Sequence, residues 1–426
     1  MDPTSQAGQD ARGPVGPLAD RTSASSDQAR PPRYMHTQQL PAQSVGGPRL
    51  ILITADDPND VSKWSGTLHS LYRALCAQTA HIRLSYTRGP LAFFDFAARV
   101  INRAVGRLGV PFDCRFSTAY AMLAGAYLTV RFLFVRNCSF VSIAGSNYVP
   151  YFATKRPIIY VSDGTFRCIA RIYPAVRAFP TWLKVQGDNN ERRTLSKARF
   201  VIYPSRWARD SAETDYRTPI DKIFELPFGP NIPEDVIERF YVPKELTKAS
   251  ILNLLFVSAD WKRKNGDMVL DICRELKASG LMVRLIAVGS TPAAIMNCGF
   301  VEDRGFLDKS DPQQLAVLCE AYRDAHFLIL PTVADAYGVV FSEAAAFGVP
   351  SVSYDVGGVG SAIVHGHTGL LLPLGASAAP FAKELVACFR DRERYQEMSR
   401  NCRTRYLTEC SWGRWAELIA HLSPTA

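Results

Sequence analysis

From residue 49 onward, short apolar runs alternate with longer segments in which apolar residues recur about every three or four positions. The short runs predict buried strands, and the longer segments predict amphipathic helices. Strands that alternate with helices indicate an α/β protein with doubly wound parallel sheets. The predicted strands are Leu50–Thr54, Cys138–Ile143, Ile158–Val161, Phe200–Tyr203, Ile251–Val257, Val283–Val288, Phe327–Leu330, Ser351–Tyr354 and Gly369–Leu372.

Helices are predicted between these strands. One opens at Trp64–Thr67 and carries Leu68, Leu71 and Leu75 at helical spacing. The other predicted helices include Asp267–Ala278 and Pro312–Ala325.

Two further segments bear on domain organisation. The chain has 426 residues, too many for one ordinary core, and Pro227–Pro233 breaks regular structure where an interdomain hinge is expected. We therefore predict one domain over 48–228 and another over 229–412, with a cleft between them. Residues 1–47 are rich in Pro, Gly, Ser, Gln, Asp and Arg, which predicts a disordered tail without a secretory signal, and Met35 is an alternative start.

The longest apolar run, Ala119–Val135, includes Arg131 and is shorter than the roughly 20 residues of a membrane span. We interpret it as a buried helix, with a membrane-surface role as the alternative.

The charge and cysteine content of the chain bear on its binding partners and its compartment. The chain has 49 Lys and Arg against 40 Asp and Glu, a net charge of +9, and a pI near 9.0. Such a balance suits an anionic membrane face, nucleic acid or phosphorylated ligands, and it does not choose among them. The positive charge is dispersed, so no nucleic-acid partner is expected. Ten cysteines without a Cys-x-x-Cys pair predict reduced thiols in a cytoplasmic protein and no metal site.

The stretch Asp335–Glu343 is the best candidate for a ligand site. It follows a predicted strand, and Gly338 opens a predicted helix whose free N–H groups at Val339 and Val340 would favour a phosphate. Asp335 and Glu343 offer acceptors for sugar hydroxyls. The alternative is an ordinary strand, loop and capped helix.

Several motifs in order suggest a family. The segment from Arg49 to Leu422 resembles the family 4 glycosyltransferases, which have the GT-B architecture of two Rossmann-like domains facing across a cleft. The motifs that carry the resemblance are Trp64–Thr67, Tyr203–Trp207, Pro227–Pro230, Phe256–Gly266, Gly305–Lys309, Asp335–Glu343, Gly366–Gly369 and Cys410–Trp412.

The resemblance implies transfer of a sugar from a nucleotide diphosphate sugar with retention of configuration and without a metal ion. It also implies that the second domain binds the donor, that the first binds the acceptor, and that a C-terminal helix over 413–426 packs back on the first domain. The family's two acidic residues match Asp335 and Glu343 (343 − 335 = 8), which places Asp335 at the donor sugar and Glu343 at the ribose. The first is Asp here, where the family has Glu.

The resemblance also points to a diphosphate clamp. The family's Arg position holds Ala259, while the Lys position holds Lys264, so Lys262 or Arg263 could supply the missing charge. Fixed cations are needed because phosphoryl oxygens gain negative charge as the glycosidic bond breaks. The alternative is that Lys262–Lys264 form a solvated surface turn.

In the first domain, Gly66 and Thr67 could contact a phosphate at a helix start, although Ser65 could equally be a simple N-cap. Asp163 follows a predicted strand and is the candidate catalytic carboxylate, with capping of the Thr165 segment as the alternative.

In the second domain, Phe306 matches the place of the nucleotide base, and a core phenylalanine is the alternative. We assign no chemistry to His69, His365 or His367.

The sequence thus predicts a retaining glycosyltransferase that acts on a glycan or lipid-linked acceptor in surface or exopolysaccharide synthesis. It would be cytoplasmic or peripheral at the inner face of a membrane, and its acceptor choice would depend on variable loops between Thr87 and Ser117. A GT-B-shaped binding protein without turnover is the main alternative. A dinucleotide-dependent oxidoreductase is disfavoured, since no Gly-x-Gly-x-x-Gly follows either first strand.

Overall fold

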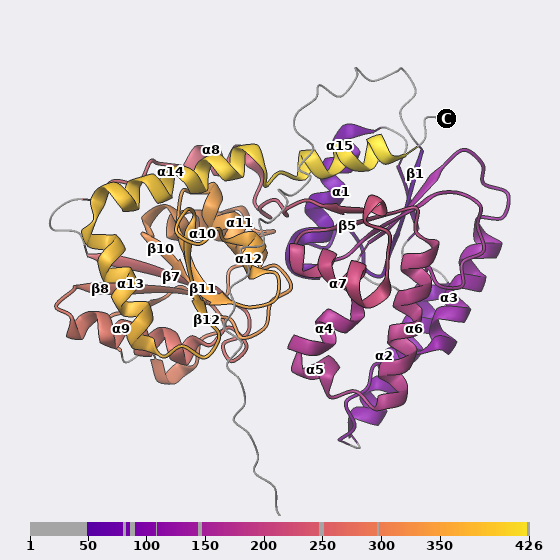
Figure 1. The fold of residues 1–426 in the computed structure, drawn as a ribbon, viewed down its shortest axis with the longest axis horizontal. Helices are drawn as coiled ribbons and strands as arrows, with labels where there is room; N and C mark the ends of the chain where they lie inside the picture. Colours follow the sequence, from indigo (N-terminus) through magenta and orange to yellow (C-terminus); the bar gives the residue numbers. More distant parts are fainter. Residues whose placement is uncertain are drawn as a thin grey trace, which may run out of the picture. The chain divides into compact units, whose positions relative to one another are not determined.

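The computed structural model describes residues 49–79, 82–85, 90–107, 109–143, 147–246, 251–295 and 298–423 (Figure 1). The predicted disordered tail and the alternative start at Met35 lie outside these residues. Two parallel six-stranded sheets form the framework, as the alternating pattern predicted. None of the helices within the described ranges combines the length and the apolar character needed to cross a bilayer.

The first sheet has the strand order β2-β1-β3-β4-β5-β6. Its central strands are almost fully buried, because helices cover both faces of a parallel sheet. The predicted strands of this half are confirmed, while β2 and β6 were missed. The strands are β1 (Leu50–Thr54), β2 (Ile82–Ser85), β3 (Ser139–Ile143), β4 (Ile158–Val161), β5 (Phe200–Tyr203) and β6 (Ile223–Glu225).

The second sheet has the order β12-β11-β10-β7-β8-β9, and all of its pairings are parallel. Every strand predicted here is present within a residue or two, and β9 was missed. The strands are β7 (Leu252–Ser258), β8 (Val283–Gly289), β9 (Val301–Asp303), β10 (Phe327–Ile329), β11 (Ser351–Asp355) and β12 (Gly369–Pro373). We call the two sheets with their helices the first lobe and the second lobe.

Most helices follow the strands as predicted. The first predicted helix begins at Thr67 rather than at Trp64, because residues 63–66 form a short 3-10 turn. The helices are α1 (Thr67–Gln78), α2 (Pro90–Arg107), α3 (Thr118–Arg131), α4 (Phe166–Ile172), α5 (Pro174–Arg177), α6 (Thr181–Lys197), α7 (Arg206–Tyr216), α8 (Glu234–Phe240), α9 (Gly266–Ala278), α10 (Pro312–Asp324), α11 (Val339–Ala346), α12 (Val359–Ala362), α13 (Ala378–Arg390), α14 (Arg392–Thr408) and α15 (Trp412–Leu422).

The region between Thr87 and Ser117 corrects a prediction. It was expected to consist of loops, but it contains α2 over Pro90–Arg107 and a 3-10 turn over Cys114–Phe116. Pro90 stands at the first position of the helix, where its missing N–H costs nothing. Among the α2 residues whose side chains the structure describes, Ala98 is buried, while Phe96, Val100 and Ile101 are exposed.

The C-terminal helix α15 contacts α1 in the first lobe. It is also tied to the irregular segment Pro227–Pro233, because the indole N–H groups of Trp412 and Trp415 donate to the carbonyl oxygens of Pro230 and Pro227, both at 2.9 Å. The segment has neither helix nor strand, as predicted, and it is buried at Phe228.

Candidate functional site

The stretch Asp335–Glu343 connects β10 to α11, as the sequence predicted. Gly338 is the N-cap of α11 and has a φ of 83°, in the left-handed region that favours glycine. A Cβ added there would lie 2.5 Å from the ring of Phe341, so a larger residue would not fit. Only glycine therefore fits at this position, which directly precedes the free N–H groups at the start of α11.

A buried ion pair lies beside this helix start. The ammonium of Lys264 contacts the carboxylate of Asp335, and both residues are almost fully buried. Burial lowers the pKa of the Lys264 ammonium, and the negative charge of Asp335 acts in the opposite direction. The alternative that the whole Lys262–Lys264 run is a solvated turn is wrong for Lys264.

The other two cations of the run are placed differently. Lys262 is exposed. The guanidinium of Arg263 donates to the carbonyl oxygen of Ala334 at 3.0 Å and pairs with Asp260 at 3.2 Å. Arg263 thereby supports the backbone beside Asp335, while the sequence distinguished none of the three cations by burial.

Glu343 is buried inside α11, with only 1% of its surface exposed. One carboxylate oxygen accepts from the hydroxyl of Tyr322 at 2.9 Å. The other accepts from the backbone N–H of Asn231 at 3.3 Å and contacts the ammonium of Lys309. Lys309 closes the Gly305–Lys309 motif, yet the sequence reading gave it no role.

Asn231 links Glu343 to the predicted glycine turn of the first lobe. Its side-chain amide donates to the carbonyl oxygen of Ser65 at 2.7 Å and to the hydroxyl of Thr67 at 3.1 Å. Gly66, not Ser65, is the N-cap of α1, with a φ of 88° and no side-chain cap, so the Ser65 alternative is wrong. Asn231 therefore connects the Ser65–Thr67 turn, through its side-chain amide, to Glu343, through its backbone N–H. The sequence analysis missed this residue.

Asp163 follows β4 and is held by the residue before that glycine turn. The indole N–H of Trp64 donates to its carboxylate at 3.0 Å. Desolvation raises the pKa of Asp163, the Trp64 hydrogen bond lowers it, and the charge of Asp335 adds to the rise. The capping alternative is wrong, because the hydroxyl of Thr165 itself caps α4 by accepting from Cys168 N–H at 3.3 Å.

The turn that carries Trp64 is strained. Trp64 and Ser65 have φ values of 48° and 57°, which non-glycine residues seldom adopt. Each such residue costs about 1–3 kcal/mol and persists only where its surroundings impose it. The hydrogen bonds from Trp64 to Asp163 and from Asn231 to Ser65 hold this turn in place, and they keep the indole N–H directed at the Asp163 carboxylate.

Tyr173 also reaches the Asp335 loop and was missed by the sequence analysis. Its hydroxyl oxygen accepts from the backbone N–H of Ala336 at 3.0 Å. Burial raises the pKa of Tyr173, and the charges of Asp335 and Asp163 raise it further. A neutral hydroxyl therefore lies near two carboxylates, one from each lobe.

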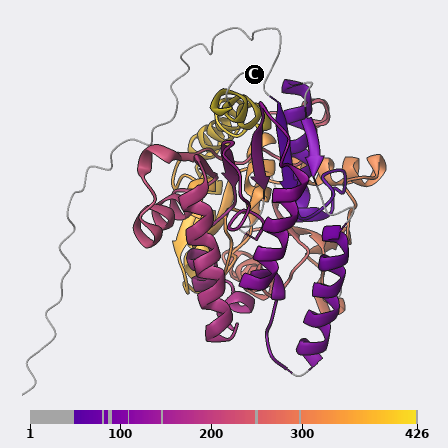
Figure 2. The same cartoon turned by 90° about the vertical axis from the view of Figure 1, so that its right-hand side faces the viewer.

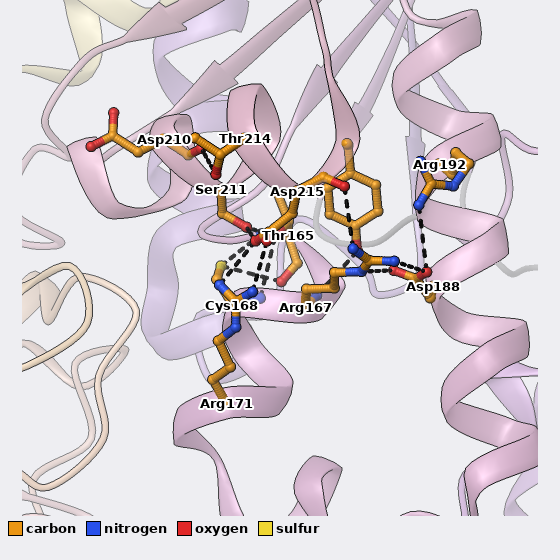
Figure 3. Close-up of polar contacts among 11 residues, drawn as sticks. Thr165, Arg167, Cys168, Arg171, Asp188, Arg192, Asp210, Ser211, Thr214 and Asp215 are labelled. Atoms are coloured by element: carbon orange, nitrogen blue, oxygen red, sulfur yellow. Dashed lines mark hydrogen bonds and ion pairs between the residues drawn. The ribbon is translucent and has the colours of Figure 1, made fainter. Parts of the chain in front are cut away.

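Ion pairs fix α4, which ends just before Tyr173 (Figure 3). Arg167 forms two hydrogen bonds of 2.7 Å with Asp188 of α6. Arg171 forms two of 2.9 and 2.7 Å with Asp215 of α7. Bidentate pairs of this kind restrict orientation as well as distance. The network therefore holds α4, whose C-cap is Tyr173, against α6 and α7.

We predict that Tyr173→Phe lowers kcat about threefold to tenfold with little change in donor KM, since one hydrogen bond of about 1 kcal/mol to the Asp335 loop is lost. Steady-state kinetics of the purified variant would measure this. Tyr151→Phe is the matched control, because Tyr151 contacts Arg193 rather than this loop. Equal kinetics for Tyr173→Phe and the wild type would contradict the role.

Val339, Val340 and Phe306 were also predicted to contact the donor. Val340 is buried in the core of the second lobe and Val339 is half-buried, so near the helix start both offer backbone N–H groups rather than side chains. Phe306 has 69% of its surface exposed, so the alternative of a core phenylalanine is wrong.

No group of three or more His, Cys, Asp and Glu side chains within the described ranges could hold a metal ion. The absence of a metal from the reaction stays a prediction. The Nδ1 atom of each of His69, His365 and His367 contacts another protein group, which agrees with their having been assigned no chemistry.

The fold matches that of solved glycosyltransferases. Sucrose-phosphate synthase from Thermosynechococcus elongatus gives a TM-score of 0.60 at 15% identity, over 88% of this chain and 98% of that chain. An Anabaena protein solved in complex with UDP gives a TM-score of 0.58 at 13% identity, again over 88% and 98%. This chain therefore has the GT-B fold.

The second lobe also matches a family. Residues 252–391 match the family model described as Glycosyl transferases group 1. A relative from Nocardia farcinica, named D-inositol 3-phosphate glycosyltransferase, is 34% identical over 175 residues. The match covers 38% of this chain and only 38% of that relative's length.

Proposed function

We propose that this protein is a retaining glycosyltransferase that moves a sugar from a nucleotide diphosphate sugar to a hydroxyl of a glycan or lipid-linked acceptor. The observation that carries the proposal is the convergence of Lys264, Asp335 and the start of α11 within one buried cluster. A cation and free backbone N–H groups suit a diphosphate, and neighbouring carboxylates suit sugar hydroxyls.

The donor would lie with its diphosphate against Lys264 and Gly338. Its ribose would lie toward Glu343, and its base near Phe306. Support comes from the second lobe's family match and from the fold's likeness to a protein solved with UDP. A phosphate oxygen would share the three donors of the Lys264 ammonium with Asp335.

In the reaction, the leaving diphosphate would be stabilised by Lys264 and the helix start, where charge develops as the glycosidic bond breaks. The same diphosphate would take the proton from the attacking acceptor hydroxyl. The acceptor would therefore attack the face of the sugar from which the diphosphate departs, which retains the anomeric configuration. Asp335 and Asp163 would hold sugar or acceptor hydroxyls, with Trp64 and Tyr173 fixing their positions.

We further propose that this transfer serves surface or exopolysaccharide synthesis in the cytoplasm, at the inner face of a membrane. The net charge of +9 supports contact with an anionic surface. Access to a lipid-linked acceptor would require such contact.

Nucleotide binding and turnover test the proposal together. A thermal-shift panel of UDP, GDP, ADP and dTDP should raise the melting temperature with one of them, because only a ligand of the folded state stabilises it. The matching sugar nucleotide should then release that diphosphate when lipid-linked glycan is added. Binding without release in the presence of acceptor would favour the alternative of a binding protein without turnover, and no binding would reject both.

A further inference from the structure

Helix α3 exposes an apolar stripe. Its buried residues face the core of the first lobe, but its opposite side presents Ala119, Met122, Ala126 and Val130 to solvent at helical spacing. Met122 and Val130 are 52% and 76% exposed. A helix of a globular protein normally presents polar residues on its solvent side, so this face calls for a partner.

The segment after α3 extends the stripe. Leu133 and Phe134 are 57% and 89% exposed, and they lie between Arg131 and Arg136, both exposed. A phenylalanine that is almost entirely in solvent between two arginines is an expensive surface feature for a protein that works free in water.

Helix α2 lies against α3, and Figure 2 shows the two helices side by side. It exposes three apolar residues, Phe96, Val100 and Ile101, together with three arginines. These arginines are Arg99, Arg103 and Arg107. α2 thus adds both apolar surface and positive charge to the same part of the first lobe.

Helix α6 adds Trp182 and Val185, which are 52% and 53% exposed. Both belong to this surface, because the Trp182 ring lies 5.8 Å from that of Phe112 and the α3 residue Thr118 donates its N–H to Gln186 of α6 at 2.8 Å. We call the exposed apolar residues of α2, α3, residues 133–134 and α6 the apolar face.

The charge on α2, α3 and the residues between and after them is mainly positive. Residues 90–136 contain six arginines and two aspartates, with no lysine or glutamate. One of the aspartates, Asp113, is already paired with Arg115 at 2.6 Å. Arginines beside apolar residues can extend their heads to lipid phosphates while their stems lie along the apolar boundary.

We propose that the apolar face docks on the surface of an anionic lipid bilayer, with Phe134 and Val130 entering the acyl boundary and the arginines of α2 on the headgroups. Self-association fits less well, since it would bring two arginine-rich rims together and like charges repel. The inference deepens the proposed function by placing its membrane contact, but the docking itself requires neither donor nor acceptor.

Vesicle sedimentation of the full chain tests the proposal. Wild type should bind vesicles of phosphatidylcholine with about 30 mol% phosphatidylglycerol, and bind pure phosphatidylcholine at least about tenfold more weakly. Val130→Ser/Phe134→Ser and Arg99→Glu/Arg103→Glu should each lower the partition coefficient about tenfold or more. High salt should weaken wild-type binding.

Two matched controls lie on the second lobe. Met282→Ser/Leu374→Ser removes apolar residues that are 63% and 55% exposed. Lys383→Glu/Arg390→Glu reverses two exposed charges on α13. Both should bind vesicles as wild type does, and thermal melting should show that all four variants fold.

Equal vesicle binding by wild type and the apolar-face variants would overturn the proposal. A wild-type protein that does not bind anionic vesicles would also overturn it. If that wild type were a dimer and Val130→Ser/Phe134→Ser a monomer, the apolar face would instead be a self-association surface. Because no donor is present, a protein that binds vesicles yet transfers no sugar would support the docking and count only against the proposed function.

Discussion

Replacing Glu343 with alanine is expected to abolish sugar transfer and to weaken nucleotide binding about 10- to 100-fold. The loss follows from removing a buried carboxylate whose hydrogen bonds to charged or hydroxyl groups are worth about 1.5–3 kcal/mol each. Calorimetric titration of the nucleotide selected by the thermal-shift panel would measure the affinity, and release of diphosphate would measure turnover.

Stability has to be followed in the same variant. Alanine at 343 leaves the Lys309 ammonium and the Tyr322 hydroxyl without the carboxylate they contact, which is expected to cost about 2–4 kcal/mol of unfolding free energy. Tyr322→Phe is the matched control, because it removes one hydrogen bond but keeps the carboxylate. Nucleotide affinity should change less than about threefold in that control, and unchanged turnover in Glu343→Ala would count decisively against the assignment.

Replacing Lys264 with methionine is expected to lower kcat about 100- to 1,000-fold, the range seen when one preorganised charge stabiliser is lost from a transition state. Methionine keeps the length of the side chain but cannot offset negative charge on a leaving diphosphate. Donor KM should rise less than kcat falls, since the charge develops mainly in the transition state. Steady-state kinetics with varied donor would separate the two effects.

Lys262→Met is the natural control for that experiment. The two lysines are two positions apart, but Lys262 is exposed while Lys264 is buried against Asp335. Lys262→Met should lower kcat less than about threefold, because solvent screens the charge of the exposed lysine. A larger loss in Lys262→Met than in Lys264→Met would show that the diphosphate lies elsewhere.

Most of the strands that the sequence predicted are rich in apolar residues along their length. β1 and β4 are buried along their whole length, and each reads as an almost uninterrupted apolar run. The strands that were missed, β2, β6 and β9, all lie at sheet edges. Edge strands are short and carry polar residues, so their sequences resemble loops.

The residues of the candidate site also differ in whether the sequence could predict them. The helix start at Gly338 and the carboxylates at 335 and 343 leave a local trace, because glycine and acidic residues occur at a fixed spacing. Asn231 and Tyr173 leave none, since their partners are more than a hundred residues away in the chain. Which lysine of the Lys262–Lys264 run is buried depends on packing that spacing does not encode.

The most direct test of the account is a crystal structure of this protein with the nucleoside diphosphate that raises its melting temperature. The account predicts the diphosphate within hydrogen-bond distance of the Lys264 ammonium and the first N–H groups of α11, with the ribose turned toward Glu343. A nucleotide bound away from both Lys264 and α11 would contradict it.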